Sequence, residues 1–154
     1  MVTFDTNVLV YAFDSDDANK RERARGLLRV ARDTDLVLTA QVLGEFLNVF
    51  RRKLPQKLDK ARAQAERFLS LFPVIPSTGE DMLKASDFSS RHKLQFWDSL
   101  IWQVAASAGV TALLSEDMQD GLTIDGLTVI DPFNPANAAL IDVLLTPMEG
   151  IERP

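Results

Sequence analysis

The sequence of 154 residues contains no cysteine, and this absence excludes disulfide bonds, thiolate zinc sites and thiol nucleophiles together. Histidine is nearly absent as well: His92 is the only one, and its polar surroundings, SSRHKLQ, are typical of a solvated helix end. The chain also lacks a basic start followed by an apolar signal core, and it lacks an apolar run of membrane-spanning length. We therefore expect a cytoplasmic protein without a membrane segment.

The overall composition is that of a folded globular protein, with 46% hydrophobic and 25% charged residues. A chain of this length forms one domain with a substantial core more readily than two. The formal net charge of -5 disfavours unselective coating of nucleic acid, because that affinity comes from lysine and arginine contacts with phosphates. A local basic face remains compatible with binding nucleic acid.

Short apolar or β-branched runs alternate with longer stretches of helical period along the chain. This alternation predicts an α/β fold, a parallel sheet flanked by helices on both faces. The expected strands are 2–4, 36–39, 73–76, 110–115 and 127–131, and the expected helices are 17–32, 40–53, 57–71, 81–93, 98–108 and 136–145. Prolines punctuate the chain after Asp131, so we divide it into a main domain, 1–131, and a C-terminal extension, 132–154, with one short helix.

Four carboxylates stand in places where apolar residues are expected. Asp5 ends the first strand and Asp117 follows the fourth, and ligands of open α/β sheets gather at the carboxyl ends of strands. Glu45 falls within the apolar stripe of helix 40–53. Asp98 precedes the inward face of helix 98–108. The spacing therefore predicts that all four acids face one region.

Each acid also has a purely structural explanation. Asp5 and Asp98 could cap helices, Asp117 could be a turn residue, and Glu45 could pair with a buried arginine. Four carboxylates that face one point repel each other, however, and persist when a cation compensates them. Ligands that are all oxygen suit Mg²⁺ or Mn²⁺. The pattern therefore favours metal-assisted hydrolysis of phosphodiester bonds.

Four motifs resemble, in this order and spacing, those of the PIN domain: FDTNVLVYAFD, the glutamate of VLGEFLNVFRR, FWDSLIWQVA and LLSEDMQDG. The commonest single-domain bacterial members of that family are VapC-type toxins of type II toxin-antitoxin systems. The resemblance covers residues 1–131. It implies a five-stranded parallel sheet, one or two Mg²⁺ or Mn²⁺ ions and endoribonuclease activity on RNA. It also implies a homodimer controlled by an antitoxin protein, whose C-terminal segment occupies the active-site groove.

The resemblance also assigns residues. The family's four acids correspond to Asp5, Glu45, Asp98 and Asp117. The three aspartates would hold the metal directly or through water, and Glu45 would complete the pocket by ligation or by orienting the attacking water. Asn7 and Ser115 match polar positions that orient ligands in the family. Asp120 departs from the pattern of many relatives, and it could add a ligand or alter the preference for a metal.

Basic and apolar side chains provide candidate binding surfaces. The basic ones are Arg21, Arg25, Arg29 and Arg32 on the first long helix, and Arg51, Arg52 and Lys53 at the end of the second. They could flank the acidic pocket and contact the phosphates of RNA, or they could form a solvated face. The apolar residues of 42–50 and Leu140, Ile141, Leu144 and Leu145 could form a dimer or antitoxin surface, or the core.

Other functions remain open at this point. A haloacid-dehalogenase-like phosphatase would need a second acid at position 7, where the chain has Asn7. A receiver domain would need paired acids beside the end of the first strand. Within the PIN family, an RNA-processing nuclease without an antitoxin and a catalytically idle module that only binds RNA or protein are both alternatives. The presence of all four acids disfavours the idle module.

Overall fold

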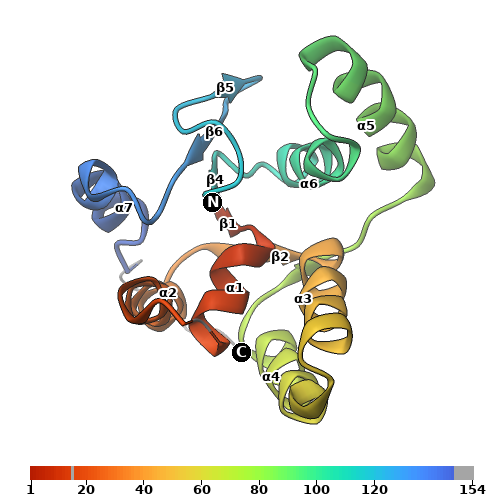
Figure 1. Ribbon diagram of the computed structural model, residues 1–154. Helices are drawn as coiled ribbons and strands as arrows, with labels where there is room; N and C mark the ends of the chain where they lie inside the picture. Colours follow the sequence, from red (N-terminus) through yellow and green to blue (C-terminus); the bar gives the residue numbers. More distant parts are fainter. Residues whose placement is uncertain (15, 148–154) are drawn as a thin grey trace.

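The computed structural model describes residues 1–14 and 16–147, and its centre is a six-stranded sheet (Figure 1). The strand order is β3-β2-β1-β4-β6-β5. All neighbouring strands are parallel except β5, which pairs antiparallel with β6. The strands are β1 (Val2–Phe4), β2 (Leu36–Thr39), β3 (Val74–Ile75), β4 (Ala112–Leu114), β5 (Thr123–Ile124) and β6 (Leu127–Ile130).

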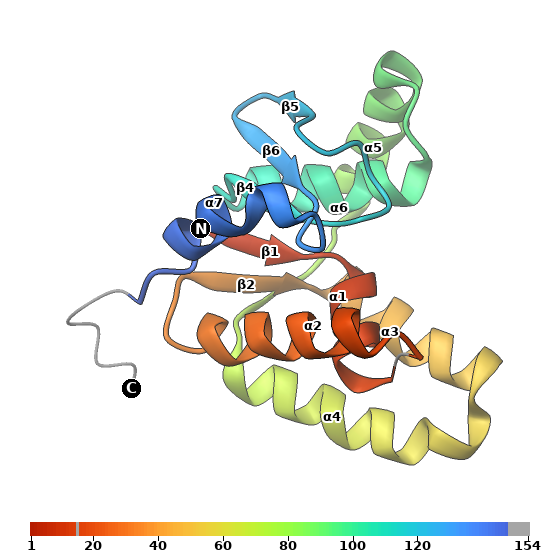
Figure 2. The ribbon, with the colours of Figure 1, turned by 60° about the vertical axis from the view of Figure 1, so that its left-hand side comes forward.

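Helices cover both faces of the sheet. In Figures 1 and 2, α5 and α6 lie on one side, and α1, α2 and α4 lie on the other. The α-helices are α1 (Thr6–Phe13), α2 (Ala18–Ala31), α3 (Ala40–Lys53), α4 (Leu58–Leu71), α5 (Gly79–His92), α6 (Phe96–Ser107) and α7 (Ala138–Leu144), with 3-10 turns η1 (Pro55–Lys57) and η2 (Pro135–Asn137). No helix in the described part of the chain is long and apolar enough to cross a bilayer.

The predicted α/β architecture is confirmed, and the six predicted helices are all present with ends that differ by at most two residues. The strand count is different, because a sixth short strand, β5, joins the five expected parallel strands as an antiparallel edge. Asp125 and Gly126 form the two-residue turn between β5 and β6, with φ angles of 50° and 83°. An Asp-Gly pair between β-branched runs is a strong hairpin signal. The sequence therefore carries a local signal for this strand, which is not among the five predicted strands.

Helix α1 begins directly after β1, because Asp5 caps it and its first turns bury Val8 and Leu9 completely. Helix α3 likewise follows β2 without a loop, with the Thr39 hydroxyl accepting from the backbone N–H of Val42. These direct transitions from strand to helix place both helix starts at the carboxyl edge of the sheet.

The apolar residues that could have formed a surface lie mostly in the core. Phe46 and Phe50 of α3 are fully buried, with ring centroids 5.0 Å apart, and Phe68 packs on Phe46 at 5.6 Å. Burying an aromatic side chain contributes about 2–3 kcal/mol. Core packing therefore accounts for most of the apolar stripe of α3, which decides between the two alternatives, surface or core, that the sequence left open.

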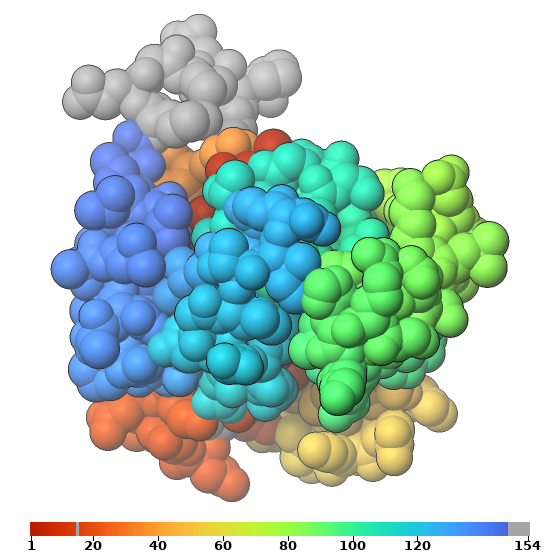
Figure 3. Space-filling view, turned by 90° about the horizontal axis from the view of Figure 1, so that it is seen from above, coloured from red at the N-terminus to blue at the C-terminus, as the bar shows by residue number. Residues whose placement is uncertain are grey.

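The C-terminal segment packs on the domain through α7. Ile141 and Leu145 are buried in the same core as the sheet, whereas Leu140 is 48% exposed. Figure 3 shows the segment on one side of the β5–β6 region and α5 on the other side. The predicted short helix is confirmed, and the domain boundary at Asp131 stays a prediction. The last seven residues of the extension, 148–154, lie outside the described residues.

Candidate active site

Asp5 is both a helix cap and a buried acid. Its side chain is the N-cap of α1, accepting the N–H of Thr6 at 2.6 Å, so the capping explanation is correct for this residue. The residue is only 7% exposed. Burial, opposed by its hydrogen bonds and reinforced by the charges of Asp117 and Glu45, raises the pKa of Asp5 to about 6. The cap therefore carries a carboxylate whose negative charge is disfavoured by its surroundings.

Two neutral side chains connect Asp5 with Asp117. The hydroxyl of Ser115 donates to Oδ2 of Asp5 at 2.6 Å and accepts the N–H of Asp117 at 3.2 Å. The amide of Asn7 donates to Oδ2 of Asp5 at 3.3 Å and to Oδ2 of Asp117 at 3.2 Å. The parallel pairing of β1 with β4 causes this proximity, because it brings the residues that follow both strands to one edge.

Glu45 enters the site from the second turn of α3. Its Oε2 accepts from the hydroxyl of Thr6 at 2.7 Å, and its Oε1 accepts from the amide of Gln41 at 2.8 Å. The same amide donates to the backbone oxygen of Trp97 at 2.9 Å, which connects α3 to the first turn of α6. The partners of Glu45 are therefore neutral, and the predicted alternative of a buried arginine partner is wrong.

Asp98 is the third residue of α6 and lies half-buried. Gln95 takes the N-cap position, so the explanation of Asp98 as an N-cap is wrong. Burial raises the pKa of Asp98, with smaller contributions from the charges of Asp117 and Glu45. The same two charges act on Asp5. The structure thus brings the four predicted acids into one electrostatic cluster, in which the charges of Asp117 and Glu45 disfavour ionisation of Asp5 and Asp98.

The donor chemistry of this cluster fits a hard divalent cation, because its ligands are carboxylate oxygens held by hydrogen bonds. In the described residues, no three acidic or imidazole side chains form a ready-made metal cage. Mg²⁺ needs no such cage, since it commonly binds through one or two carboxylates, several waters and the phosphates of its substrate. The cluster fits that open mode of binding.

Asp120 has a different role from its neighbours in the sequence. Its carboxylate accepts the N–H of Asp131 at 2.9 Å and the side-chain amides of Asn134 and Asn137 at 3.0 Å. These bonds lower the pKa of Asp120. Because both oxygens are engaged in holding the start of the C-terminal segment, the geometry gives no support to the ligand role considered from the sequence.

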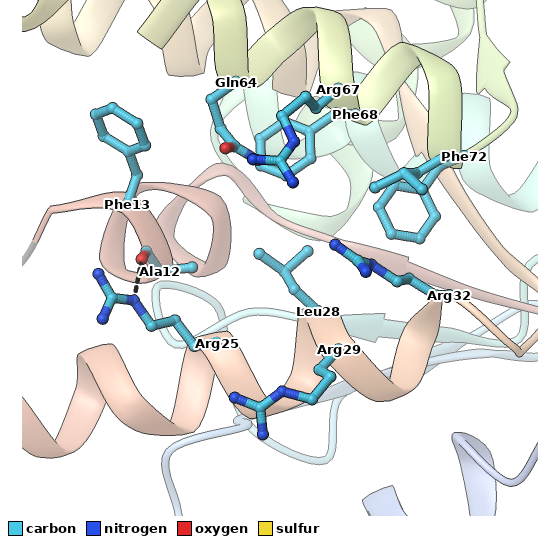
Figure 4. Close-up of a pocket in the computed structure, with 11 residues that line it drawn as sticks. Ala12, Phe13, Arg25, Leu28, Arg29, Arg32, Gln64, Arg67, Phe68 and Phe72 are labelled. Carbon is cyan, nitrogen blue, oxygen red and sulfur yellow. Dashed lines mark hydrogen bonds between the residues drawn. The ribbon is translucent and has the colours of Figure 1, made fainter. Parts of the chain in front are cut away.

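The arginines of α2 line a groove. This arginine groove has a volume of about 560 Å³ and lies between α2 and α4. Figure 4 shows Arg32 and Arg67 extending into it from opposite walls. Its residues are Ala12, Phe13, Arg25, Leu28, Arg29, Arg32, Gln64, Arg67, Phe68, Leu71 and Phe72, and none of the four acids is among them. Arg25, Arg29 and Arg32 therefore belong to a surface separate from the acidic cluster, and RNA binding there stays a prediction.

The remaining predicted basic residues lie elsewhere. Arg51 and Arg52 are exposed in the last turn of α3, where Arg51 donates to the side-chain oxygen of Asn48. Arg21 on α2 is half-buried and does not line the arginine groove. Position 52 is seven residues after Glu45, which places Arg52 on the same helix face about 10.5 Å further along the axis.

A second hydrogen-bonded group borders the acids and was not predicted from the sequence. The hydroxyl of Tyr11 donates to Glu116, and Nζ of Lys20 lies 2.5 Å from the other oxygen of that carboxylate. Lys20 also lies 5.1 Å from the ring centroid of Tyr11. Glu116 immediately precedes Asp117, so this group fixes the loop that carries it. The partners are about a hundred positions apart, and no local pattern signals their pairing.

A model of the PIN domain family matches residues 2–119, which is most of the chain. The chain belongs to the PIN domain family. The recognition from four motifs is thereby confirmed. A comparison with curated proteins gives no match.

Solved structures similar to this PIN domain come from toxin-antitoxin systems. A toxin-antitoxin complex from Klebsiella pneumoniae has a TM-score of 0.64 at 20% identity, covering 86% of this chain and 98% of that one. The Mycobacterium tuberculosis toxin VapC20, described as cleaving the sarcin-ricin loop, has a TM-score of 0.63 at 20% identity, covering 76% and 92%. VapBC2 from Rickettsia felis, bound to promoter DNA, has a TM-score of 0.61 at 18% identity, covering 84% and 97%. At these identities, the similarity establishes the fold.

Proposed function

We propose that this PIN domain protein is an endoribonuclease that hydrolyses RNA with the help of Mg²⁺ or Mn²⁺. The observation that carries the proposal is the cluster of four carboxylates, in which burial raises the pKa of Asp5 and Asp98 and the charges of Asp117 and Glu45 raise both further. A cluster of this kind is stabilised by a bound cation. Ribonuclease activity is typical of the family. The single histidine, which is exposed, leaves no pair of imidazoles for acid-base catalysis without a metal.

The side chains divide into ligands and groups that hold them. Asp5, Asp98 and Asp117 would hold the cation directly or through water, and Glu45 would complete the site. A bound Mg²⁺ supplies an activated water and stabilises charge on the attacking and leaving oxygens. Ser115 and Asn7 keep Asp5 and Asp117 in place through the hydrogen bonds described above. Thr6 and Gln41 do the same for Glu45.

We propose that Arg51 and Arg52 contact RNA phosphates beside the scissile bond. Arg52 is exposed and shares a helix face with Glu45, so a chain bound at the acids passes within its reach. Arginine contacts of this kind fix the register of a nucleic acid without reading its sequence.

We propose further that the arginine groove binds an acidic, amphipathic segment of a partner protein, as an antitoxin would supply, separate from the C-terminal segment that the family resemblance assigns to the active-site groove. Its floor is apolar, with Leu28, Phe68 and Phe72, and the arginines line its rim. An RNA backbone has no apolar face to cover such a floor, whereas a helix with acidic and apolar sides matches both features. A toxin of this type acts on cellular RNA in the cytoplasm, and we expect it to form a homodimer.

Cleavage of a mixed RNA pool tests the central proposal. The pool is incubated with Mg²⁺ or Mn²⁺, beside a reaction with chelator and one with the Asp98→Asn variant, and the product ends are mapped. We expect cuts that need the metal, leave a 5′-phosphate and a 3′-hydroxyl, and vanish in the variant. A cyclic phosphate product, or the absence of metal binding, would contradict the proposal.

Growth measurements separate a toxin from an RNA-processing enzyme. Induced expression of the wild-type protein should arrest growth, and Asp98→Asn should not. A small protein encoded beside it should restore growth when both are expressed. Cleavage in vitro without any growth arrest would favour the processing enzyme.

A further inference from the structure

Trp97 carries an exposed indole on a backbone that lies beside the acidic cluster, and we infer that a base of the RNA substrate stacks on it. The inference rests on the proposed function and makes Trp97 a specificity-determining residue of that reaction. The chain has two tryptophans. Trp102 is completely buried, whereas Trp97 is 58% exposed. Among the described residues, Trp97 is the only aromatic side chain that is both large and exposed.

The backbone of Trp97 is fixed next to the acids. It directly precedes Asp98 in the first turn of α6. Its carbonyl oxygen accepts from Nε2 of Gln41 at 2.9 Å, and the same nitrogen donates to Glu45 at 2.8 Å. One amide therefore holds both Glu45 and the residue that carries the indole.

The indole is supported from one side by a neighbouring ring. Phe96 and Trp97 have centroids 5.2 Å apart at an interplanar angle of 79°. Phe96 is anchored, because it packs against the small cluster of Ala85, Leu100 and Val104 between α5 and α6. An edge-to-face contact limits the orientations of the indole without covering both of its faces. A preorganised aromatic face of this kind can take a stacked base at a low entropic cost.

Electrostatics favour an uncharged contact at this position. The four acids and the net charge of -5 repel the phosphates of an approaching RNA. Stacking of a base on an aromatic ring does not depend on charge, and every base has a face that can stack. Single-stranded RNA presents its bases in this way. Trp97 thus supplies affinity that does not depend on contacts with the phosphates.

Binding measurements in an Asp98→Asn background, which prevents cleavage, test the inference. One probe is a 12-nucleotide single-stranded RNA of mixed sequence, and the other is the same ribose-phosphate chain without bases. We expect the RNA to quench the fluorescence of Trp97. We expect Trp97→Leu to raise the Kd of the RNA by roughly 5- to 150-fold, as for the loss of one stacked base. The Kd of the abasic chain should not change.

Three further variants control the interpretation. Trp97→Phe should retain most of the affinity, because it keeps an aromatic face. Leu83→Ala on α5 removes another exposed apolar side chain, 75% exposed, and should bind as tightly as the parent. Trp97→Leu with an otherwise wild-type site should cleave RNA with a raised KM. An unchanged far-UV circular dichroism spectrum and thermal midpoint would establish that each variant is folded.

The outcomes separate this inference from the proposed function. If the wild type cleaves RNA while Trp97→Leu binds it as tightly as the parent, only the inference is overturned. Equal weakening of the RNA and the abasic chain would also overturn it, since a phosphate contact would then be lost. If acrylamide fails to quench Trp97 in an RNA-free dimer, a second copy covers the indole and the inference is wrong. If no RNA is bound or cleaved by the wild type, the proposed function itself fails.

Discussion

The acidic cluster gathers negative side chains and the arginine groove gathers positive ones. The two surfaces differ in how these side chains are held. Three of the acids, Asp5, Glu45 and Asp117, accept hydrogen bonds from neutral donors, namely Ser115, Asn7, Thr6 and Gln41. In the arginine groove, Arg25 donates to the backbone oxygen of Ala12. Within residues 1–14 and 16–147, Arg32 and Arg67 have no carboxylate partner.

This difference suits each surface to a different kind of ligand. Carboxylates fixed by hydrogen bonds are suited to a small cation, whose ligands must lie within a few tenths of an ångström of their places. Exposed arginines on flexible stems adapt to a large and variable partner. We therefore expect substitutions at the acids to affect chemistry strongly, and substitutions at the arginine groove to affect association.

The largest expected effect is that of Asp98→Asn on cleavage. Losing this charge should lower the rate of RNA cleavage by about 10²- to 10⁴-fold, the range for losing a group that positions or activates the attacking water. The metal-free variant should be as stable as the wild type or more stable, because one of several repelling charges is gone. Cleavage assays and denaturant unfolding would measure the two effects.

Asp59→Asn is the matched control, because its side chain is 96% exposed and its ion pair with Arg62 lies on the surface. It should change neither quantity. If Asp98→Asn instead lost the same stability with and without metal, Asp98 would be a structural residue and the acidic cluster would lose one of its members.

The pH dependence of stability should reveal the cost of burying the charged form of Asp5 beside Asp117 and Glu45. The pKa of Asp5 is about 6 in the folded protein against 3.8 in the unfolded chain. The folded state therefore binds the proton of Asp5 more tightly than the unfolded chain does. The stability that this proton contributes is fully present below about pH 4 and is lost as the pH rises through 6. The difference is on the order of 3 kcal/mol. The raised pKa of Asp98 acts in the same direction.

Denaturant unfolding of the metal-free protein between pH 4 and 7.5 would measure this loss. Asp81 and Asp120 have lowered pKa values and act in the opposite direction, so the informative quantity is the difference between wild type and Asp5→Asn. Asparagine can still cap α1, and it cannot titrate. Parallel stability curves for the two proteins would show that Asp5 is not strained by its neighbours.

Ser115→Ala should weaken the metal site without removing a ligand. The buried hydroxyl holds Asp5 and lowers its pKa, so its loss should reduce the affinity for Mn²⁺ by about 10- to 100-fold, as for other groups that orient a ligand. Titration calorimetry with Mn²⁺ would measure this. Ser90→Ala is the control, since that exposed hydroxyl donates to the backbone oxygen of Ser86. Equal affinities for Ser115→Ala and wild type would show that the hydroxyl of Ser115 does not orient a metal ligand.

Most features that depend on residues close together in the sequence were predicted, whereas those that depend on contacts between distant residues were not. Helix α3 was predicted to the residue because its period and the Leu54-Pro55 break are local. The four acids were found because the strand-end rule and helical spacing place them without knowledge of the partners. The role of Asp120 stays open in the sequence because its hydrogen bonds depend on Asn134 and Asn137, which come close to it only in the tertiary structure.

The arginine stripe shows the same limit. The spacing on α2 put the arginines on one face, but it could not indicate that α4 forms the opposite wall, since α2 and α4 are separated by β2 and α3 in the sequence. Arg67 was not among the predicted basic residues for this reason. The topology of the fold decides which element packs opposite a given helix face. Residue spacing along one helix carries no information about that partner.

The smallest expected effect distinguishes the arginines near the acids from those in the groove. If Arg52 contacts a phosphate, Arg52→Gln should raise the Kd for single-stranded RNA a few-fold and reduce the slope of log Kd against log salt by about 0.7. Arg67→Gln should leave both unchanged, because we assign the groove to a protein partner. Binding titrations at four salt concentrations would measure the slopes. An equal reduction for both variants would place RNA in the arginine groove as well, and the two surfaces would then be parts of a single RNA path around the molecule.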